Sequence, residues 1–386
     1  YSGYIHSSYE FHQKFNSADL VKNIQVELSN FTSYLSAVIH IISDSILTLS
    51  LICVLIYLNP TGTIFLLFYL SIASFIFLFI TKKNLDMWGA RRLKIDGDLA
   101  LTLTESLKGI RDIKVSMLEN QFLKRYKLIN SVKFSIYWKQ LTFGQIPRIY
   151  IELISIIGFI FFILYLLQNE ASLIAILPII SVYLAAFFRA LPSINRLLSS
   201  YQQLRYYLPS VLLIKKEINY SRVENLKKNI LNSFKKSIYL NDVSFKYGDK
   251  IILNKLNLEF KKGKIYGIKG SSGAGKTTLA SILLGLLKPS DGIIKVDNRE
   301  VINFQWSKIL SYVSQNIFLF DSTIIENICL GVRKSKINIE KVDDVLKKTN
   351  LYEFVYSLSD GLNTKLGENG TNLSGGQSQR LALARA

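Results

Sequence analysis

The chain contains few of the residues that build metal centres and disulfide frameworks. Among its 386 residues there are two cysteines, Cys53 and Cys329, and three histidines, His6, His12 and His40. Neither cysteine has a metal-ligand spacing, and Cys53 lies in an apolar run, so a disulfide between them is not expected. Acidic residues are also scarce, with 28 against 47 lysines and arginines and a formal net charge of +19. Such a balance suits nucleic acid, an anionic membrane surface, or the cytoplasmic side of a membrane protein.

Charge is missing altogether over several long apolar stretches. Residues 45–81 carry no charged side chain, and the tetrapeptide Asn59–Gly62 interrupts them with a turn signal. Residues 153–169 and 171–188 are also uncharged, and a short polar segment at 168–172 joins them. A membrane-crossing helix needs ~20 apolar residues. The pattern therefore predicts two hairpins of membrane spans, at 35–58, 63–81, 148–168 and 172–190.

The distribution of lysine and arginine predicts the orientation of these spans. The two hairpin turns contain neither residue, whereas the connection 82–146 is rich in both. Positive charge stays on the cytoplasmic side of a membrane. We therefore expect the connection and the C-terminal half to face the cytosol. This arrangement accounts for much of the net charge without nucleic acid, which we do not expect as a partner.

Beyond residue 190 the pattern changes from apolar helices to a mixed domain. Residues 191–219 keep a helical pattern, and the basic stretch 227–236 is typical of a linker. Strand-like segments follow at Ser237–Tyr247, Leu253–Phe260 and Ile265–Lys269, and helix-like segments at 276–287, 338–350 and 374–386. We predict a multidomain protein, with an all-α membrane domain at 1–219, a linker at 220–236 and an α/β nucleotide-binding domain at 237–386.

A complete phosphate-binding loop lies between a predicted strand and a predicted helix. Its sequence is Gly270-Ser271-Ser272-Gly273-Ala274-Gly275-Lys276-Thr277, followed by Thr278. Glycines let successive backbone N–H groups surround phosphates, and the helix N-terminus adds a favourable dipole. Lys276 is placed to reach the β- and γ-phosphates, and the Thr277 hydroxyl can ligate Mg²⁺. By itself the loop indicates an NTPase or a kinase that binds ATP and Mg²⁺.

A second motif narrows the family. A helix start with the sequence Leu373-Ser374-Gly375-Gly376-Gln377 is a further anion site, because N–H groups and the positive helix end converge there. At this point the chain resembles the ABC ATPases, whose signature is Leu-Ser-Gly-Gly-Gln. The flanks Gln379-Arg380 and Ala384-Arg385-Ala386 are similar to that family too. The resemblance implies an exporter-type half-transporter that pairs with a second half, which we expect to be a second copy in a homodimer, with ATP between the loop of one half and the signature of the other.

The resemblance carries further residues over one at a time. Tyr247 matches an aromatic that stacks on adenine, with a core aromatic as the alternative. Gln315 matches a glutamine that senses Mg²⁺ and the γ-phosphate, with a polar strand end as the alternative. The segment Phe320–Ile328 resembles the exporter sequence that follows this glutamine. The segment Gly367–Gly370 resembles a loop that touches the membrane domain, with an ordinary turn as the alternative.

The membrane half is also similar to exporters, less specifically. Phe15–Leu20 and Glu105–Lys114 resemble intracellular coupling segments, and Arg189–Arg196 resembles bacterial lipid-linked-oligosaccharide flippases. An arginine at membrane depth is costly unless it faces a wet cavity or a partner. We therefore predict that Arg189 contacts an anionic substrate head group. The alternative is that Arg189 and Arg196 extend to the cytoplasmic interface and act as anchors.

The chain also departs from the family pattern. The Walker B aspartate, the catalytic glutamate and the switch histidine of the family follow the signature helix, and this sequence ends at Ala386 before them. The family's first two membrane helices are absent, and the sequence starts at Tyr1. We therefore expect a fragment that contains no catalytic residue, binds Mg-ATP weakly and does not hydrolyse it.

The function expected for the complete protein is ATP-driven export or flipping across the cytoplasmic membrane. The substrate is an amphipathic or lipid-linked molecule, with a lipid-linked oligosaccharide as one candidate and drugs, lipids or peptides as alternatives. A soluble ABC ATPase acting on nucleic acid would suit the charge but not the four spans. An ATP-gated channel or a regulator is the third class left open.

Overall fold

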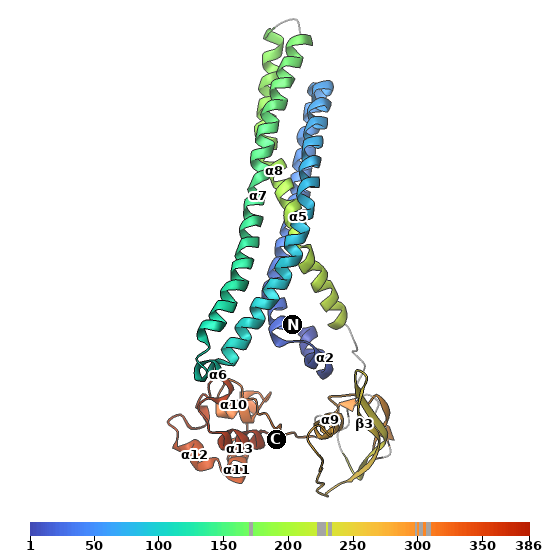
Figure 1. Cartoon of the computed structure of the whole chain (residues 1–386), viewed down its shortest axis with the longest axis vertical. Helices are drawn as coiled ribbons and strands as arrows, with labels where there is room; N and C mark the ends of the chain where they lie inside the picture. The colour runs from blue at the N-terminus through green and yellow to red at the C-terminus, as the bar shows by residue number, and fades with distance from the viewer. Residues whose placement is uncertain (170–172, 222–228, 231–233, 298, 301–303, 306–309) are drawn as a thin grey trace. The chain divides into compact units, whose positions relative to one another are not determined.

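A computed structural model describes residues 1–169, 173–221, 229–230, 234–297, 299–300, 304–305 and 310–386. The chain divides into two compact units, Tyr1–Glu224 and Asn225–Ala386. Blue to yellow-green in Figure 1 marks the first unit, and yellow to red marks the second. Each unit is described by itself below.

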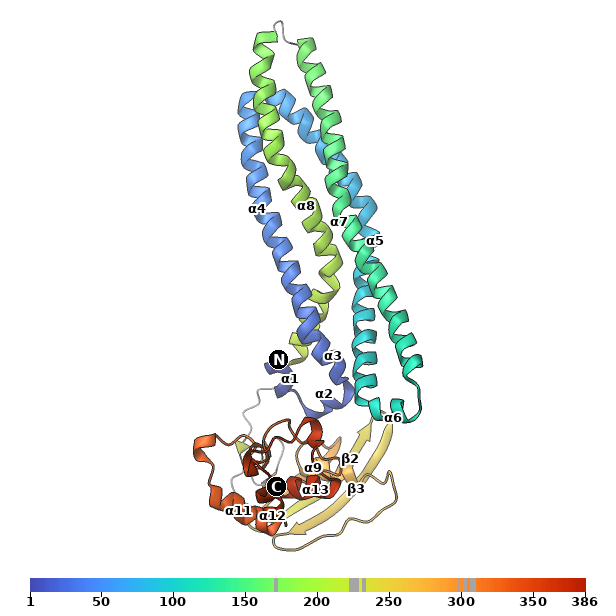
Figure 2. The same cartoon turned by 90° about the vertical axis from the view of Figure 1, so that its left-hand side faces the viewer.

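The first unit is entirely helical. Three short helices, α1 (Ser2–His6), α2 (Tyr9–Lys14) and α3 (Ser17–Lys22), lead through a π-helical turn, η1 (Asn23–Glu27), into the long helix α4 (Leu28–Leu58). Then follow α5 (Pro60–Lys108), the short α6 (Ile110–Val115), α7 (Glu119–Asn169) and α8 (Leu173–Ser221). Helix α4 packs along α8, and α5 packs along α7 (Figure 2).

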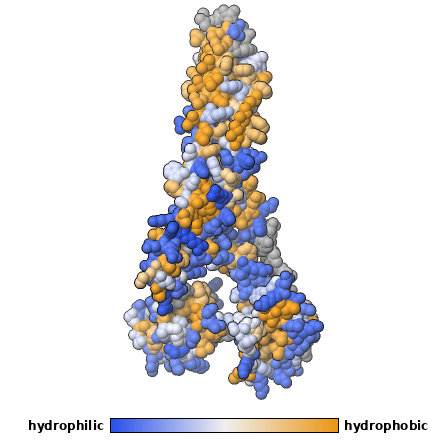
Figure 3. Space-filling view, viewed as in Figure 1, coloured by the Kyte–Doolittle hydropathy of each residue, from blue (hydrophilic) through white to orange (hydrophobic). Residues whose placement is uncertain are grey.

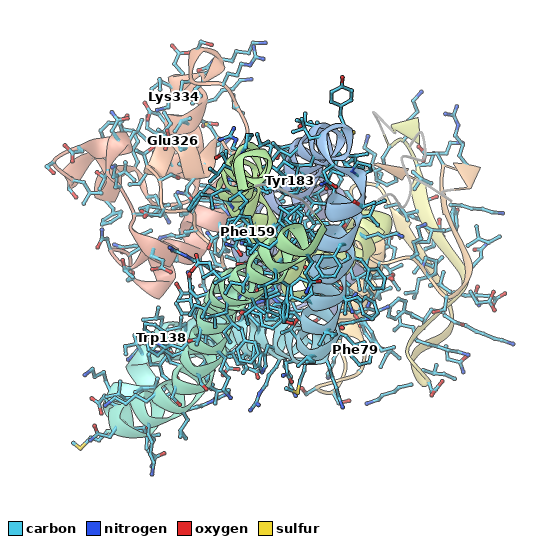
Figure 4. All side chains as sticks on the ribbon, turned by 90° about the horizontal axis from the view of Figure 1, so that it is seen from above. Phe79, Trp138, Phe159, Tyr183, Glu326 and Lys334 are labelled. Carbon is cyan, nitrogen blue, oxygen red and sulfur yellow. The ribbon has the colours of Figure 1, made fainter. Side chains whose placement is uncertain are left out.

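Four helices of the described part of the chain are long and apolar enough to cross a membrane. They are Ser17–Leu58, Pro60–Lys108, Glu119–Gln168 and Leu177–Ile218, with 42 to 50 residues each. In their most apolar stretches only 6–29% of the residues are buried inside the unit. Hydrophobic side chains therefore face outward, as the orange surface over the upper helices in Figure 3 shows. Phe79 and Trp138, at the periphery in Figure 4, are 75% and 52% exposed.

The helices continue well beyond the predicted spans. The connection predicted at 82–146 consists mainly of the extensions of α5 and α7, with α6 between them. These extensions are held by a buried cluster that includes Leu85, Trp88, Ile136 and Tyr206. The charged residues that distinguish these extensions from the spans in the sequence lie on helices that also bury an apolar stripe. The start of the span predicted at 172 and the hairpin residues 170–172 lie outside the described residues.

The hairpin predicted between the first two spans is closed by local hydrogen bonds. The side chain of Asn59 accepts a hydrogen bond from the Gly62 amide at 3.0 Å, and Pro60 is the first residue of α5. Proline suits this position because its missing N–H would have had no partner there. The Tyr183 hydroxyl of α8 donates to the Asn59 carbonyl at 3.0 Å. The turn is therefore anchored to the neighbouring span.

Helices α5 and α8 approach closely at a single glycine. A Cβ atom built on Gly89 would collide with the Tyr206 carbonyl oxygen, so the missing side chain brings the two backbones together. Gly144 on α7 differs, because a Cβ there would meet nothing within 4 Å. The closeness at Gly89 is thus a property of that position and not of helical glycines generally.

The second unit begins with a β-sheet. Strands β2 (Ser237–Tyr247), β3 (Lys250–Lys261), β4 (Asp291–Val296) and β5 (Arg299–Glu300) form an antiparallel sheet in the order β3-β2-β4-β5. Helix α9 (Lys276–Leu283) covers it through Leu279 and Ile282, which join a core with Leu240, Val243 and Val296. A short parallel pair, β1 (Asn229–Ile230) and β6 (Phe304–Gln305), completes the described strands.

The predicted strand Ile265–Lys269 is wrong. Residues 264–271 have no strand assignment, and none of the described strands pairs with them. Ile265 is fully exposed and Ile268 is 47% exposed. A short apolar run forms a strand where neighbouring strands supply hydrogen-bond partners, and this run has none among the described residues.

The rest of the described second unit consists of short helices joined by irregular segments. It comprises α10 (Ile324–Ile328), α11 (Ile339–Lys348), α12 (Tyr352–Ser357) and α13 (Gly375–Arg385), with 3₁₀ turns η2 (Lys334–Lys336), η3 (Gly361–Asn363) and η4 (Glu368–Gly370). Buried side chains such as Leu319, Ile324, Leu346, Leu366 and Leu381 form its own core. The N-terminal end of α13, which carries the signature motif, is thereby held on a packed core.

Candidate functional site

The phosphate loop leads directly into helix α9. Gly273 and Gly275 have φ values of +82° and +89°, which a residue with a side chain rarely adopts. Gly275 is the N-cap residue of α9, so the loop lies directly at the helix N-terminus, where unpaired backbone N–H groups favour an anion. Residues 270–274 are exposed. The loop therefore presents an open backbone cradle to an anion.

Strand β3 supports this loop from below. A Cβ atom on Gly275 would come within 2.8 Å of the Leu253 side chain and 3.0 Å of Ile252. Leu253 is itself buried in the core with Leu279 of α9. Two glycine properties, the left-handed φ and the close contact, thus coincide at Gly275.

Lys276 lies folded over the loop. Its ammonium nitrogen donates to the Gly270 carbonyl at 2.8 Å and to the Ser271 carbonyl at 2.7 Å. The positive charge of Lys276 is therefore held next to the first two residues of the loop. Thr277 and Thr278 follow in the first turn of α9, and Thr277 is exposed. The donor set fits a nucleotide's phosphates, and the free face of the Thr277 hydroxyl fits a hard cation such as Mg²⁺.

Tyr247 lies at the end of β2, where this strand pairs with the start of β3. It ends β2, two residues after Phe245, which is paired with Leu253 of β3. Its ring packs edge-on against Phe245 with centroids 4.9 Å apart, and Tyr247 remains 45% exposed. The strand register therefore brings this aromatic toward the part of β3 that supports Gly275.

The signature motif is the N-terminus of α13. Ser374 caps the helix, because its hydroxyl accepts a hydrogen bond from the Gln377 amide at 3.3 Å. The Ser374 amide in turn donates to the side-chain oxygen of Gln377 at 2.7 Å. This reciprocal capping box fixes the helix start. Ser374, Gly375 and Gly376 stay exposed, and Leu373 packs against the core.

Gln315 lies in an irregular, exposed stretch that leads to α10. The start of this stretch is tied to the C-terminal end of α13, since the Ser311 hydroxyl donates to the carbonyl of Ala386, the C-cap residue, at 2.6 Å. Among the described contacts, none joins Gln315 to the phosphate loop, and none joins the loop to the signature. Tyr247 therefore ends the strand that pairs with β3, whose Leu253 lies against Gly275, while Gln315 lies in the stretch tied to the end of α13.

A set of hydrogen bonds behind the signature helix was not predicted from the sequence. Arg385, at the end of α13, donates to the Phe318 carbonyl, the Asn327 carbonyl and the Asn327 side-chain oxygen at 2.7–2.9 Å. Burial lowers the pKa of the Arg385 guanidinium. The sequence Ala384-Arg385-Ala386 indicated the family. It did not indicate this contact, because 58 residues separate Arg385 from Asn327.

The exporter-like segments of the second unit are ordered turns. Thr323 and Glu326 form a second capping box at the start of α10. Gly367 and Gly370 have φ values of +72° and +74°, and a Cβ atom on Gly370 would overlap the Leu319 side chain. Leu319 is 1% exposed in the core. The loop around Glu368 is thus a turn whose left-handed positions are occupied by glycine, with Gly370 packed on the core and Glu368 exposed.

The two arginines predicted near the end of the last span have different surroundings. Arg189 is exposed. Arg196 pairs with Asp44 of α4, with its Nε and Nη2 atoms 2.9 Å and 2.7 Å from the two carboxylate oxygens. Asp44 is 3% exposed. Arg196 is therefore a partner in an interhelical ion pair, which neither the head-group nor the anchor hypothesis anticipated.

The coupling-like segments form the ends of helices. Asn16 caps α3 through a hydrogen bond from the Ala18 amide at 2.9 Å. Residues 105–114 include the junction of α5 and α6 at Gly109. Both segments are therefore turns at the end of the helical unit that carries the lysine-rich and arginine-rich extensions.

Comparisons with known proteins agree with this arrangement. A family profile described as ABC transporter matches residues 253–386. The ATP-dependent lipid A-core flippase of Francisella tularensis subsp. holarctica (strain OSU18) is 28% identical over 393 residues, covering 97% of this chain and 63% of the flippase. A lacticin-481/lactococcin-DR transport/processing ATP-binding protein of Lactococcus lactis subsp. lactis is 32% identical over 295 residues, covering 75% of this chain and 41% of that protein.

A solved structure shares the fold. A bacterial Atm1-family ABC exporter with ATP bound aligns with a TM-score of 0.82 at 22% identity, covering 98% of this chain and 68% of that one. The chain spans about three fifths of the length of the flippases that it matches. Its four apolar helices and these relatives make it a multi-pass inner-membrane protein with a cytoplasmic ATP-binding domain. Residues 253–386 thus match the ABC transporter family, and the chain has the fold of an ABC exporter, in which a helical domain with long apolar helices is fused to an ATP-binding domain.

Proposed function

We propose that this chain is the motor-bearing half of an exporter that moves an amphipathic, lipid-linked molecule across the inner membrane with the energy of ATP. The geometry of the phosphate loop carries the proposal. An exposed backbone cradle, two left-handed glycines and a lysine held over the cradle together form a site for a triphosphate.

In this proposal the nucleotide lies along the second unit. Its adenine stacks on Tyr247, its phosphates accept hydrogen bonds from the N–H groups of residues 270–278, and Lys276 leaves its two carbonyl partners to meet them. Mg²⁺ binds the Thr277 hydroxyl, and Gln315, which contacts no loop residue in the described chain, would approach the ion once the nucleotide is bound. Because a lysine ammonium moves between acceptors without losing its hydrogen bonds, the switch from carbonyls to phosphate oxygens costs little.

The signature of a second copy would close the site. Ser374, Gly375 and Gly376 are exposed and contact no phosphate loop within the described chain. An exposed helix N-terminus with fixed N–H groups stabilises an anion. We therefore propose a homodimer in which the signature of one chain meets the nucleotide held by the loop of the other.

The substrate is assigned by class. The flippases named above act on lipid A-core, and the Lactococcus protein acts in transport and processing. An apolar cavity of about 470 Å³ lies among α4, α5, α7 and α8, with Phe159 and Tyr183 (Figure 4) in its wall. Such a cavity favours a molecule with a hydrocarbon part. The test for the motor site comes first, because it is independent of the substrate.

The Lys276→Ala variant tests the motor site. We expect the affinity for Mg-ATP, measured with a fluorescent nucleotide on the protein in lipid nanodiscs, to fall by more than about tenfold because the phosphate charge loses its partner. Lys336→Ala is the matched control, since Lys336 is exposed in η2, outside the loop. Equal ATP affinity in the Lys276→Ala variant and the wild type would contradict the proposal.

A further inference from the structure

A polar cavity of about 330 Å³ lies among the cytoplasmic extensions of α5, α7 and α8. Its wall includes five side-chain amides and a hydroxyl, contributed by Gln140, Gln145, Asn195, Ser199, Gln202 and Gln203. A cavity of this size holds a sugar ring or several waters. Its chemistry differs from that of the apolar cavity, whose lining is almost entirely hydrocarbon.

Three buried side-chain atoms of two residues in this wall lack hydrogen-bond partners within the described chain. Gln202 is 3% exposed, and both its Oε1 and its Nε2 atoms have no partner there. The Oδ1 atom of Asn195, about two turns before Gln202 on α8, has no partner there either. Buried polar atoms are almost always paired, so these atoms call for a partner inside the cavity.

The unmet atoms define the chemistry of that partner. Gln202 presents an acceptor and a donor side by side, and Asn195 presents an acceptor. A hydroxyl or an amide can donate and accept, whereas a phosphate oxygen at neutral pH only accepts and an ammonium only donates. Asn195 and the Oε1 atom of Gln202 therefore disfavour a phosphate and favour hydroxyl or amide groups.

The arginines of the wall already have carboxylate partners. Arg196 is paired with Asp44 as described above, and the Nε atom of Arg148 donates to Glu152 at 3.0 Å. The positive charge of each guanidinium is thus compensated by one carboxylate. These two residues therefore give the cavity no unpaired positive charge, which argues against an anionic head group in it.

The polar and apolar cavities share helix α8. Leu191, Ile194 and Leu198 line the apolar cavity, while Asn195, Ser199 and Gln202 line the polar one. The two sets occupy adjoining turns, and at ~1.5 Å per residue their centres along α8 lie within about 10 Å of each other. One amphiphile is long enough to reach both.

From this arrangement we propose that the polar cavity is a recognition site for a neutral head group rich in hydroxyl or amide groups, such as an uncharged sugar, on a lipid whose chain occupies the apolar cavity. The inference rests on the proposed function and deepens it by naming the head-group class. Gln202 is its central residue, since its amide pairs with a hydroxyl through one donated and one accepted hydrogen bond.

The experiment compares lipids that differ in the head group alone. The protein is placed in phosphatidylcholine nanodiscs that contain equal mole fractions of monoglucosyl diacylglycerol, phosphatidic acid or diacylglycerol with the same acyl chains. Lipids that stay bound are counted by native mass spectrometry, and free glucose is added in a separate arm. Maltoside detergents are avoided, because their sugar head group would compete.

We expect wild-type protein to retain the glucosyl lipid about tenfold over diacylglycerol, because a pair of buried hydrogen bonds contributes that much. Gln202→Leu should abolish the preference, and Gln121→Leu, an exposed position elsewhere on α7, should keep it. Gln140→Leu, in the same wall, is the second variant should Gln202→Leu fail to fold, and it should reduce the preference.

Three results would overturn the proposal. Preference for phosphatidic acid that is lost in Arg196→Gln would make the cavity an anion site. Equal retention of all three lipids would mean that water fills it, and competition by free glucose without lipid retention would make it a site for a soluble sugar. If these occur while Lys276→Ala still loses ATP binding, the motor site stands. Undiminished ATP binding in Lys276→Ala would refute the motor site whatever the lipids do.

Discussion

Asn327 is the centre of the hydrogen bonds that hold the signature helix. It has no exposed surface, and its side chain accepts from the Phe320 amide and from Arg385 while donating to the Phe320 carbonyl, Ser322 and Thr323. The loss of one buried side chain therefore leaves several groups unpaired at once.

Replacement of Asn327 by alanine should destabilise the second unit by about 2–4 kcal/mol, because buried donors and acceptors lose their partners. Urea unfolding followed by the loss of second-unit structure measures this. Asn316→Ala is the control, since Asn316 is exposed. Equal unfolding midpoints for Asn327→Ala and the wild type would show that the unpaired groups find water instead.

Glu326 and Lys334, side by side in Figure 4, give a prediction for acid. The Lys334 ammonium 2.8 Å away and the Thr323 backbone amide lower the pKa of Glu326 below its usual value near 4.5. A lowered pKa contributes stability above the unfolded-state pKa, and this stability is lost as pH falls through the folded value.

The second unit should therefore lose less stability between pH 6 and pH 3 in Glu326→Gln than in the wild type. Thermal unfolding of the two proteins across this range checks it. Lys334→Gln should behave in the same way, because it removes the largest cause of the shift. Parallel pH profiles for the wild type and both variants would rule out the pair as the source.

At the level of helices, Gly89 permits the close packing of α5 against α8. Gly89→Ala should lower the melting temperature of the protein in detergent, because its Cβ would collide with a backbone atom that cannot rotate away. Gly144→Ala on α7 is the matched control. It should leave the melting temperature unchanged or raise it slightly, since alanine favours helix over glycine by roughly 0.5–1 kcal/mol. A similar shift in both variants would contradict this account.

Local motifs were predictable from the sequence, and contacts between distant residues were not. The phosphate loop, the first hairpin turn and the helix start at Ser374 depend on residues within a few positions of one another, so their chemistry is visible in the sequence. Asp44 with Arg196, 152 residues apart, and Gly89 with Tyr206 depend on how helices pack, which leaves no local pattern.

One expectation was coarse and another was wrong, for the same reason. Residues 82–146 connect the spans as expected, but the sequence did not show that long helices form the connection, because those helices depend on one buried apolar stripe. The run Ile265–Lys269 has the composition of a strand, but a strand forms with neighbours, and composition says nothing about which neighbours are in reach.

For the whole molecule, the proposed ATP sandwich predicts contact between two chains. With Cys53 and Cys329 replaced by alanine, Ser272→Cys and Ser374→Cys in one chain should form disulfide-linked dimers faster when Mg-ATP is present. Electrophoresis without reductant measures the dimers. Added Lys276→Ala should remove the ATP effect because the nucleotide no longer joins the halves.

Ser359→Cys in place of Ser374→Cys is the control for random collision, since Ser359 is exposed and away from the signature. Dimers that form equally with and without Mg-ATP, or equally well through Ser359→Cys, would argue against a shared nucleotide site.

The tight crossing at Gly89 also sets the mechanics of α5. At ~1.5 Å per residue, about 44 Å of helix lies between Pro60 and Gly89 and about 29 Å between Gly89 and Lys108. The helix has no proline after its first residue, so no kink is built into either arm. A stiff rod held at Gly89 is a lever with unequal arms. A sideways displacement of its α6 end is therefore enlarged about one and a half times at the Pro60 end, in the opposite direction.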